Sequence, residues 1–209
     1  DLDWIQAGLE DFSALCTDVT ESLAIFSLMG PRSRDLLATL TPTSLDPTYF
    51  PFATSRPIEL GYTNVEAQRL SYVGELGYEL FVPTEHAQHV YEQLVTTGEQ
   101  FGLAHAGLLC MESCRVEKGY RHWGHELTPS ITPLEAGLGY FVNLDKPFHG
   151  REKLSDIKQC GVKRRNLAFQ MSGKSPPPRP VWYLKRAPFQ ARLYRMLRWL
   201  FSGPMISPM

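Results

Sequence analysis

The chain has 209 residues, a formal net charge of −1, and 43% hydrophobic residues. This suffices for one full hydrophobic core, or for one core and an unfinished second unit. No apolar run approaches the roughly 20 residues that span a bilayer, which excludes a membrane-spanning helix. The sequence opens on D-L-D-W-I-Q, without an initiating Met or a basic leader, so we expect a piece of a longer protein.

The two signs of charge are distributed unevenly along the chain. All 22 Asp and Glu residues lie at or before Asp156, whereas the sequence from Ile157 onward contains 11 Lys or Arg. Because globular domains usually intersperse the two signs, this marks a composition boundary. We therefore predict a domain over residues 1–163 and a poorly ordered, basic, proline-containing tail over residues 164–209.

The tail itself permits three interpretations. Arg192, Arg195 and Arg198 recur every three residues beside apolar side chains, a pattern that allows a basic amphipathic helix. Such a helix would bind an anionic membrane surface or a nucleic acid. The abrupt loss of acidic residues instead favours sequence from an alternative splice event or an unspliced intron. We accordingly expect neither a nucleic-acid partner nor membrane binding.

In chain order, the hydrophobic pattern predicts strands that alternate with amphipathic helices. The order β-α-β-β-α with antiparallel hairpins predicts an α+β fold built from ferredoxin-like units. The expected elements are a strand at Leu23–Leu28, a helix after Pro31 with Leu36, Leu37 and Leu40 on one face, strands at Arg56–Tyr62 and within Glu66–Val82, and helices at Thr84–Gln100 and Ala104–Lys118.

The segment Leu70–Glu79, L-S-Y-V-G-E-L-G-Y-E, carries the residues best suited to binding a ligand. Gly74 and Gly77 favour a short turn between two strands. Tyr72 at the end of one strand and Glu79 early in the next would then meet on one face of the sheet. A carboxylate accepts hydrogen bonds from N–H groups and a phenol stacks on flat rings, which suits an amino-heterocycle such as a pterin. An ordinary hairpin with a polar edge has the same spacing.

Three separated segments carry a family resemblance: L-S-Y-V-G-E-L-G-Y-E-L, R-V-E-K-G-Y-R-H-W-G and T-P-L-E-A-G-L. From about Asp3 to Lys163 the chain resembles the aminomethyltransferase-type tetrahydrofolate domain of glycine-cleavage T-proteins. The same domain occurs at the C-terminal end of mitochondrial sarcosine and dimethylglycine dehydrogenases. The segment R-H-W-G-H-E-L is most similar to the sarcosine dehydrogenase branch, and the dimethylglycine dehydrogenase branch is the next most similar. The regulatory subunit of pyruvate dehydrogenase phosphatase is a more distant, non-catalytic relative.

The resemblance implies a cofactor, a reaction and a site. Glu79 would accept hydrogen bonds from the pterin of tetrahydrofolate, Tyr72 would supply an aromatic hydroxyl, and Phe81, on the strand face of Glu79, would flank the ring. In the dehydrogenase relatives an upstream flavin domain oxidises the N-methylamine with FAD and passes electrons to electron-transfer flavoprotein. The folate domain captures the one-carbon unit. The implied location is the mitochondrial matrix.

Departures from the family pattern limit what this chain can do alone. T-proteins place an Arg just before the acidic residue at Glu112, whereas this chain has Met111. The Asp assigned as the family's acid/base has no counterpart here, and no G-x-G-x-x-G flavin loop occurs in the sequence. We therefore predict no catalytic residue in this chain, no amine dehydrogenase activity for it alone, and a missing flavin domain of the parent enzyme as its partner.

Two histidine pairs have spacings that permit metal ligation: His86 with His89, and His122 with His125. No third and fourth ligand with suitable spacing stands near either pair in the sequence. The family requires no metal. We therefore predict solvated or packing histidines and no metal site.

Three further charged residues are candidates for structural roles. Arg115 and Glu117 sit where the family helix packs near the pocket, or they form an ion pair on the surface. Glu135 follows Thr132 and Pro133, and we expect it to cap the next turn rather than to act in catalysis.

Overall fold

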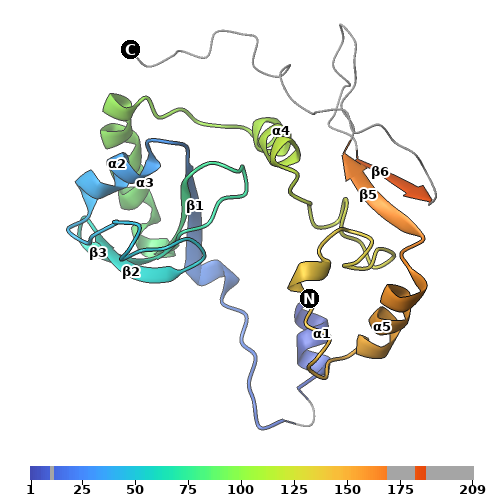
Figure 1. The fold of residues 1–209 in the computed structure, drawn as a ribbon. Coiled ribbons are helices and arrows are strands. Elements are labelled where there is room, and N and C mark those ends of the chain that lie inside the picture. The colour runs from blue at the N-terminus through green and yellow to red at the C-terminus, as the bar shows by residue number, and fades with distance from the viewer. Residues whose placement is uncertain (10–11, 169–181, 187–209) are drawn as a thin grey trace, which may run out of the picture. The chain divides into compact units, whose positions relative to one another are not determined.

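A computed structural model describes residues 1–9, 12–168 and 182–186. The chain divides into two compact units, and each is described here by itself (Figure 1). The first comprises Asp1–Ser71 and Glu75–His105, and the second comprises Tyr72–Gly74 and Ala106–Met209. Most of the predicted tail, including the basic segment at Arg192, lies outside the described residues.

The first unit is a four-stranded antiparallel sheet with two helices on one face. The strand order is β1-β4-β3-β2. Its strands are β1 (Leu23–Met29), β2 (Ser55–Leu60), β3 (Thr63–Gln68) and β4 (Gly77–Pro83), and its main helices are α2 (Ser33–Leu40) and α3 (Ala87–Gly98). Short helices α1 (Leu2–Ala7), η1 (Thr20–Ser22), η2 (Thr84–His86) and η3 (Glu99–Phe101) complete it.

This arrangement confirms the predicted α+β class. Three strands lie between α2 and α3: the strand expected at Arg56–Tyr62 and the two strands of the hairpin expected within Glu66–Val82, one more than the order β-α-β-β-α has there. Gly61, with a φ of 60°, turns the chain directly from β2 into β3. A left-handed backbone of this kind costs glycine little.

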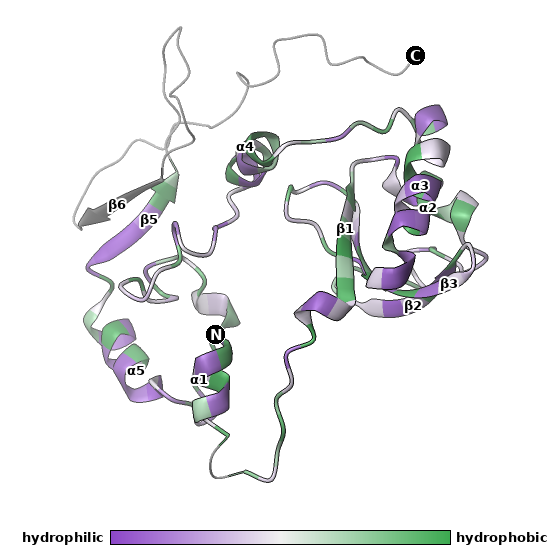
Figure 2. Cartoon of the chain, turned by 180° about the vertical axis from the view of Figure 1, so that it is seen from behind, coloured by the Kyte–Doolittle hydropathy of each residue, from purple (hydrophilic) through white to green (hydrophobic). Residues whose placement is uncertain are grey.

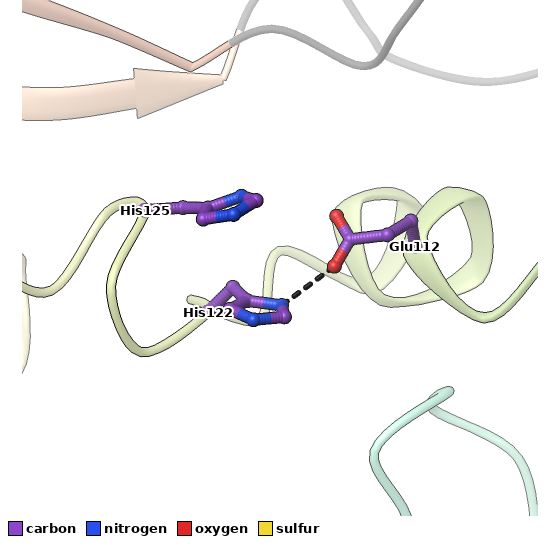
Figure 3. A group of neighbouring side chains, drawn as sticks. All are labelled: Glu112, His122 and His125. Atoms are coloured by element: carbon purple, nitrogen blue, oxygen red, sulfur yellow. Dashed lines mark hydrogen bonds and ion pairs between the residues drawn. The ribbon is translucent and has the colours of Figure 1, made fainter. Parts of the chain in front are cut away.

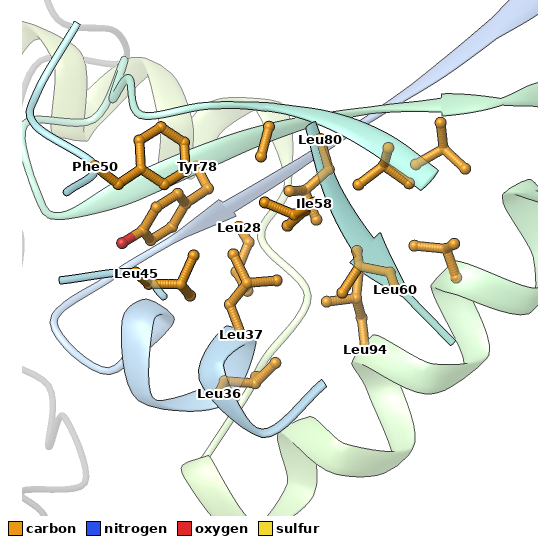
Figure 4. Packing of buried hydrophobic residues seen from close by; sticks show 14 residues of the cluster. Leu28, Leu36, Leu37, Leu45, Phe50, Ile58, Leu60, Tyr78, Leu80 and Leu94 are labelled. Carbon is orange, nitrogen blue, oxygen red and sulfur yellow. The ribbon is translucent and has the colours of Figure 1, made fainter. Parts of the chain in front are cut away.

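One hydrophobic core lies between the sheet and helices α2 and α3 (Figure 4). Residues alternate in and out along each strand, so β3 buries Val65 and Ala67 and exposes Glu66 between them. The predicted stripe on α2 is confirmed, because Leu36 and Leu37 are buried and Leu40 packs at the edge of the core. The buried members are Leu28, Leu36, Leu37, Leu45, Phe50, Ile58, Leu60, Val65, Ala67, Tyr78, Leu80, Val82, Val90 and Leu94.

The hairpin of β3 and β4 differs from the predicted one at its turn. Residues 69–76 connect the strands, so Tyr72 lies in the connection and not at a strand end. Gly74 adopts a φ of 81°, as a turn glycine does. Gly77 has another role, because a Cβ there would stand 2.0 Å from Sδ of Met29. The second glycine therefore serves close packing in β4 rather than a tight turn.

The second unit contains helices, irregular loops and a two-stranded antiparallel sheet. Its elements are α4 (Leu108–Lys118), η4 (Gly139–Phe141), α5 (Arg151–Cys160), β5 (Arg164–Ala168) and β6 (Trp182–Arg186). Helix α4 ends where it was predicted to end, because Gly119 takes the left-handed conformation with a φ of 83°.

The two units differ in what they bury. Colouring by hydropathy shows β1 of the first unit as mostly hydrophobic, whereas β5 of the second is largely hydrophilic (Figure 2). The described buried side chains of the second unit are Arg115, Val116, Glu126, Glu135, Ala136 and Asn166. Among the helices of residues 1–9, 12–168 and 182–186, none combines the length and the apolar character that crossing a membrane requires.

Candidate functional site

Two of the three predicted binding residues lie together on strand β4. Tyr78, Leu80 and Val82 point into the core, so Glu79 and Phe81 share the opposite, half-buried face. This confirms the predicted common face of Glu79 and Phe81, which follows from the alternation of side chains along a strand.

The pairing register surrounds Glu79 with polar side chains. Glu79 stands opposite Ser27 of β1 on one side and opposite Gln68 of β3 on the other. Directly opposed residues of antiparallel strands present their side chains on the same face. The row therefore presents a hydroxyl, a carboxylate and an amide to one surface. It can accept hydrogen bonds from N–H donors and can donate them from the amide.

Two apolar side chains, Phe81 and Ile25, lie next to this polar row on the same face. Phe81 stands opposite Ile25, whose side chain is 56% exposed, and opposite Glu66 on the other neighbouring strand. An exposed aliphatic and a half-buried aromatic ring offer contact area to a flat apolar ligand. The face thus combines hydrogen-bonding groups with an apolar platform.

Tyr72, the third predicted residue, belongs to the second unit. Its ring lies edge-on to that of His122, with centroids 6.1 Å apart. Burial raises the pKa of the Tyr72 hydroxyl above its ordinary value, so the group is a neutral donor near pH 7. The predicted pairing of Tyr72 with Glu79 stays a prediction, because the two residues fall in separately described units.

A network of charged side chains forms around helix α4. The Arg115 guanidinium is 2% exposed and donates to Glu112, one turn earlier on the helix, through Nε at 3.0 Å. It also donates through Nη1 to Oε2 of Glu126 at 2.8 Å and to the carbonyl of Tyr120 at 3.1 Å. Arg115 therefore connects α4 by hydrogen bonds to the loop that follows the helix.

His122 and His125 complete this network (Figure 3). The His122 backbone N–H donates to Oε2 of Glu126 at 2.7 Å, and its Nδ1 lies 2.6 Å from Oε1 of Glu112. The His125 ring stacks on the His122 ring, with centroids 4.4 Å apart and planes inclined by 22°. One ligand atom from each of Glu112, His122 and His125 lies within 4.8 Å of the other two.

The charges within the network hold one another ionised. Hydrogen bonds from Arg115, helped by His122, lower the pKa of the Glu112 carboxyl below its ordinary value. Burial alone would lower the pKa of Arg115, but its hydrogen bonds to Glu112 and Glu126 outweigh burial and raise that pKa. Both groups are therefore charged at neutral pH.

Of the two alternatives for Arg115 and Glu117, the structure contradicts the surface ion pair. Arg115 is buried and pairs with Glu112 and Glu126 instead. The Glu112 partner could have been inferred, because residues three apart on a helix face each other. Nothing in the sequence pattern indicates that Glu126 is the second partner of Arg115. The loop after Gly119 folds back towards α4 and places Glu126 beside it.

Glu135 has the structural role that was predicted. Its Oε2 accepts from the Thr132 backbone N–H at 2.9 Å, and Thr132 Oγ1 accepts from the Glu135 N–H at 3.2 Å. This reciprocal pair is a capping box. Arg164 Nε donates to Oε1 of Glu135 at 2.8 Å and lowers the pKa of the Glu135 carboxyl.

The other histidine pair packs against an aromatic ring. Tyr62 stacks on His89 with centroids 3.8 Å apart and meets His86 edge-on at 5.5 Å. These contacts match the predicted packing role of His86 and His89.

Comparison with known proteins identifies the family. Residues 1–146 match the family described as GCVT N-terminal domain. The chain is 39% identical to human mitochondrial sarcosine dehydrogenase over 176 residues, which cover 82% of this chain and 19% of that protein. It is 34% identical to rat mitochondrial dimethylglycine dehydrogenase over 190 residues, which cover 88% of this chain and 22% of that protein.

A third relative is named as a regulatory subunit rather than as an enzyme. The mouse mitochondrial pyruvate dehydrogenase phosphatase regulatory subunit is 35% identical over 170 residues, which cover 79% of this chain and 19% of that protein. The chain thus spans about one-fifth of the length of these relatives. The matched residues include the sheet with Glu79 and the network around Arg115, and the chain belongs to the GCVT N-terminal domain family.

Proposed function

We propose that this chain is the tetrahydrofolate-binding part of a sarcosine dehydrogenase, in which it receives the carbon removed from the N-methyl group. The family and the 39% identity to human sarcosine dehydrogenase support this proposal. The relatives are mitochondrial proteins, which supports a location in the mitochondrial matrix.

The observation that carries the proposal is the position of Glu79. Its carboxylate stands between Ser27 and Gln68 on the half-exposed face of the sheet, one row from Phe81. A pterin presents N–H donors at one edge and flat faces on either side, so an acceptor next to an aromatic ring fits it. In the proposal, the family resemblance makes Tyr72 the source of an aromatic hydroxyl.

The residues of this chain would bind and orient rather than perform a bond-breaking step. Tetrahydrofolate, when bound, supplies a nucleophilic amine that takes up a one-carbon unit. Holding that amine where the electrophile is released makes capture faster than escape, and this is the advantage of proximity. We assign FAD and the electron-transfer flavoprotein to other parts of the parent enzyme, because the chain carries no G-x-G-x-x-G loop.

An anaerobic titration of the purified chain with tetrahydrofolate, followed by tryptophan fluorescence, tests the proposal. We expect saturable binding that Glu79→Ala weakens about tenfold or more, equivalent to about 1.4 kcal/mol. The matched control is Glu59→Ala, because Glu59 is exposed on β2 and lies on the same face of the sheet. Binding that Glu79→Ala leaves intact, or that Glu59→Ala weakens equally, would refute the role of Glu79.

Two alternatives remain distinct from this proposal. The 34% identity to dimethylglycine dehydrogenase favours that enzyme as the second candidate for the parent protein. The 35% identity to a phosphatase regulatory subunit favours a non-catalytic regulatory module of the same fold. A well-folded chain with no affinity for tetrahydrofolate would support the regulatory alternative. Under every alternative, we expect the purified chain alone not to turn over sarcosine.

A further inference from the structure

The cluster of Glu112, His122 and His125 is not used by the proposed folate function. Its three side chains come from α4 and from the loop after it, and they converge on one point (Figure 3). Two imidazoles and a carboxylate are a donor set that divalent ions such as Zn²⁺ accept readily. We propose that these three residues bind a divalent transition-metal ion of the zinc type.

The separations within the cluster are close to those of a metal site. In a tetrahedral site, ligand atoms about 2.0–2.2 Å from the ion stand about 3.3–3.6 Å apart. The three ligand atoms already lie within 4.8 Å of one another. His125 is exposed, so its ring can turn from its stack on His122 towards the ion with little cost in packing.

The contact between His122 and Glu112 shows where the ion enters. Nδ1 of His122 and Oε1 of Glu112 lie 2.6 Å apart, within hydrogen-bond distance. An ion that binds between them would take the nitrogen and the oxygen as ligands and would spread them apart. Imidazole binds a metal in its neutral form, so a His122 ring that binds through Nδ1 would carry its proton on Nε2.

Arg115 orients the carboxylate without occupying the proposed ligand atom. It donates to Oε2 of Glu112 through Nε at 3.0 Å and Nη2 at 2.5 Å, which leaves Oε1 for the ion. Hydrogen bonds of this kind fix the direction of a metal ligand. Glu126 pairs with Arg115 at 2.8 Å, so two carboxylates and one guanidinium leave a net charge of −1 beside the ion.

The prediction of no metal rested on the lack of a third ligand near the histidine pair. The fold supplies that ligand from Glu112, which Gly119 and the following loop bring beside His122. With three protein ligands, a four-coordinate ion keeps one position for water or for a small ligand. The site is reached from solvent through the exposed His125.

Zinc titration of the 209-residue chain against a chromophoric chelator tests this proposal. The background should be Cys110→Ser with Cys160→Ser, because both thiols are exposed and thiolates also bind Zn²⁺. We expect one equivalent of Zn²⁺ to bind, and His125→Ala to weaken binding at least tenfold. His149→Ala, at another exposed histidine of the second unit, should change the affinity less than twofold.

Paramagnetic Co²⁺ supplies a second readout that does not depend on a variant folding. With the histidine ring signals observed by NMR, substoichiometric Co²⁺ should shift or broaden those of His122 and His125 and spare those of His86, His89 and His149. Equal effects of His125→Ala and His149→Ala, equal broadening of all histidines, or no Zn²⁺ binding at about 100 μM would each overturn the proposal. Tetrahydrofolate binding is measured separately, so failure of one proposal leaves the other standing.

Discussion

Each of the two compact units of this chain is stabilised by a different kind of interaction. The first packs leucine, valine and aromatic side chains between a sheet and two helices. The second buries Arg115, Glu126, Glu135 and Asn166, with Val116 and Ala136 as its buried apolar residues among those described. Hydrophobic packing is non-directional, whereas each buried charge needs a partner at a defined position. The first unit should therefore tolerate changes of charge and the second should not.

The strongest test of this difference is Arg115→Met. The change keeps an unbranched, flexible side chain but removes the guanidinium, which leaves Glu126, 7% exposed, without its cation. Removing one partner of a buried ion pair costs about 3–5 kcal/mol. We expect α4 to lose protection against amide hydrogen exchange while the strands of the first unit keep theirs.

Two further variants sharpen the Arg115 experiment. Lys118→Met removes a cation from an exposed position on the same helix and should have little effect. Adding Glu126→Gln to Arg115→Met removes the unpaired charge and should restore part of the lost stability. If Arg115→Met and Lys118→Met behaved alike, the second unit would not depend on its ion network.

The reciprocal test of the first unit is Leu37→Ala. Leu37 is fully buried between α2 and the sheet, so the change creates a cavity and should cost about 2–5 kcal/mol. Urea denaturation measures the loss, and hydrogen exchange should assign it to the first unit. Leu109→Ala is the control, since Leu109 is 77% exposed and its loss should change stability by less than about 0.5 kcal/mol.

The smallest expected effect is the pH dependence that Glu135 contributes to the stability of the second unit. Arg164 lowers the pKa of Glu135 in the folded chain, so this carboxylate stabilises the fold above the ordinary glutamate pKa. That stability should be lost as the pH falls through the lowered, folded-state pKa. Glu135→Gln should flatten this part of the curve of unfolding free energy against pH. Because Arg164 is 36% exposed, solvent screening keeps the effect below those of Arg115 and Leu37. An unchanged curve would contradict the assignment.

The first unit could largely be predicted from the sequence because periodicity reports burial. The stripe of Leu36 and Leu37 and the shared face of Glu79 and Phe81 both follow from the repeats of helix and strand. The connection between β3 and β4 was harder to predict, because a glycine in the sequence can mark either a turn or a position of close packing. A Cβ at position 77 would collide with Met29 Sδ and with the Leu70 carbonyl oxygen, and no local pattern contains these contacts.

The second unit could be predicted only in part because its contacts depend on loop paths. The capping of Thr132 by Glu135 is local, and the sequence predicted it. The pairing of Arg115 with Glu126 joins a helix to an irregular loop, and charge alone does not select one of several nearby acids. The same loop path brings Glu112 to His122.

The hydrogen bonds of strand β5 determine where the chain can be shortened without disturbing the second unit. The Asn166 side chain donates to the Glu126 carbonyl at 3.0 Å, and its backbone N–H donates to the Glu135 carbonyl at 2.9 Å. Although the family match ends at residue 146, these bonds cross that boundary. Proteolytic removal of the residues from Arg164 onward would remove the Arg164 cation and both hydrogen-bond donors of Asn166 together. We expect the segment from Glu126 to Glu135 to lose protection against hydrogen exchange after such a cut, because Glu126 also pairs with Arg115.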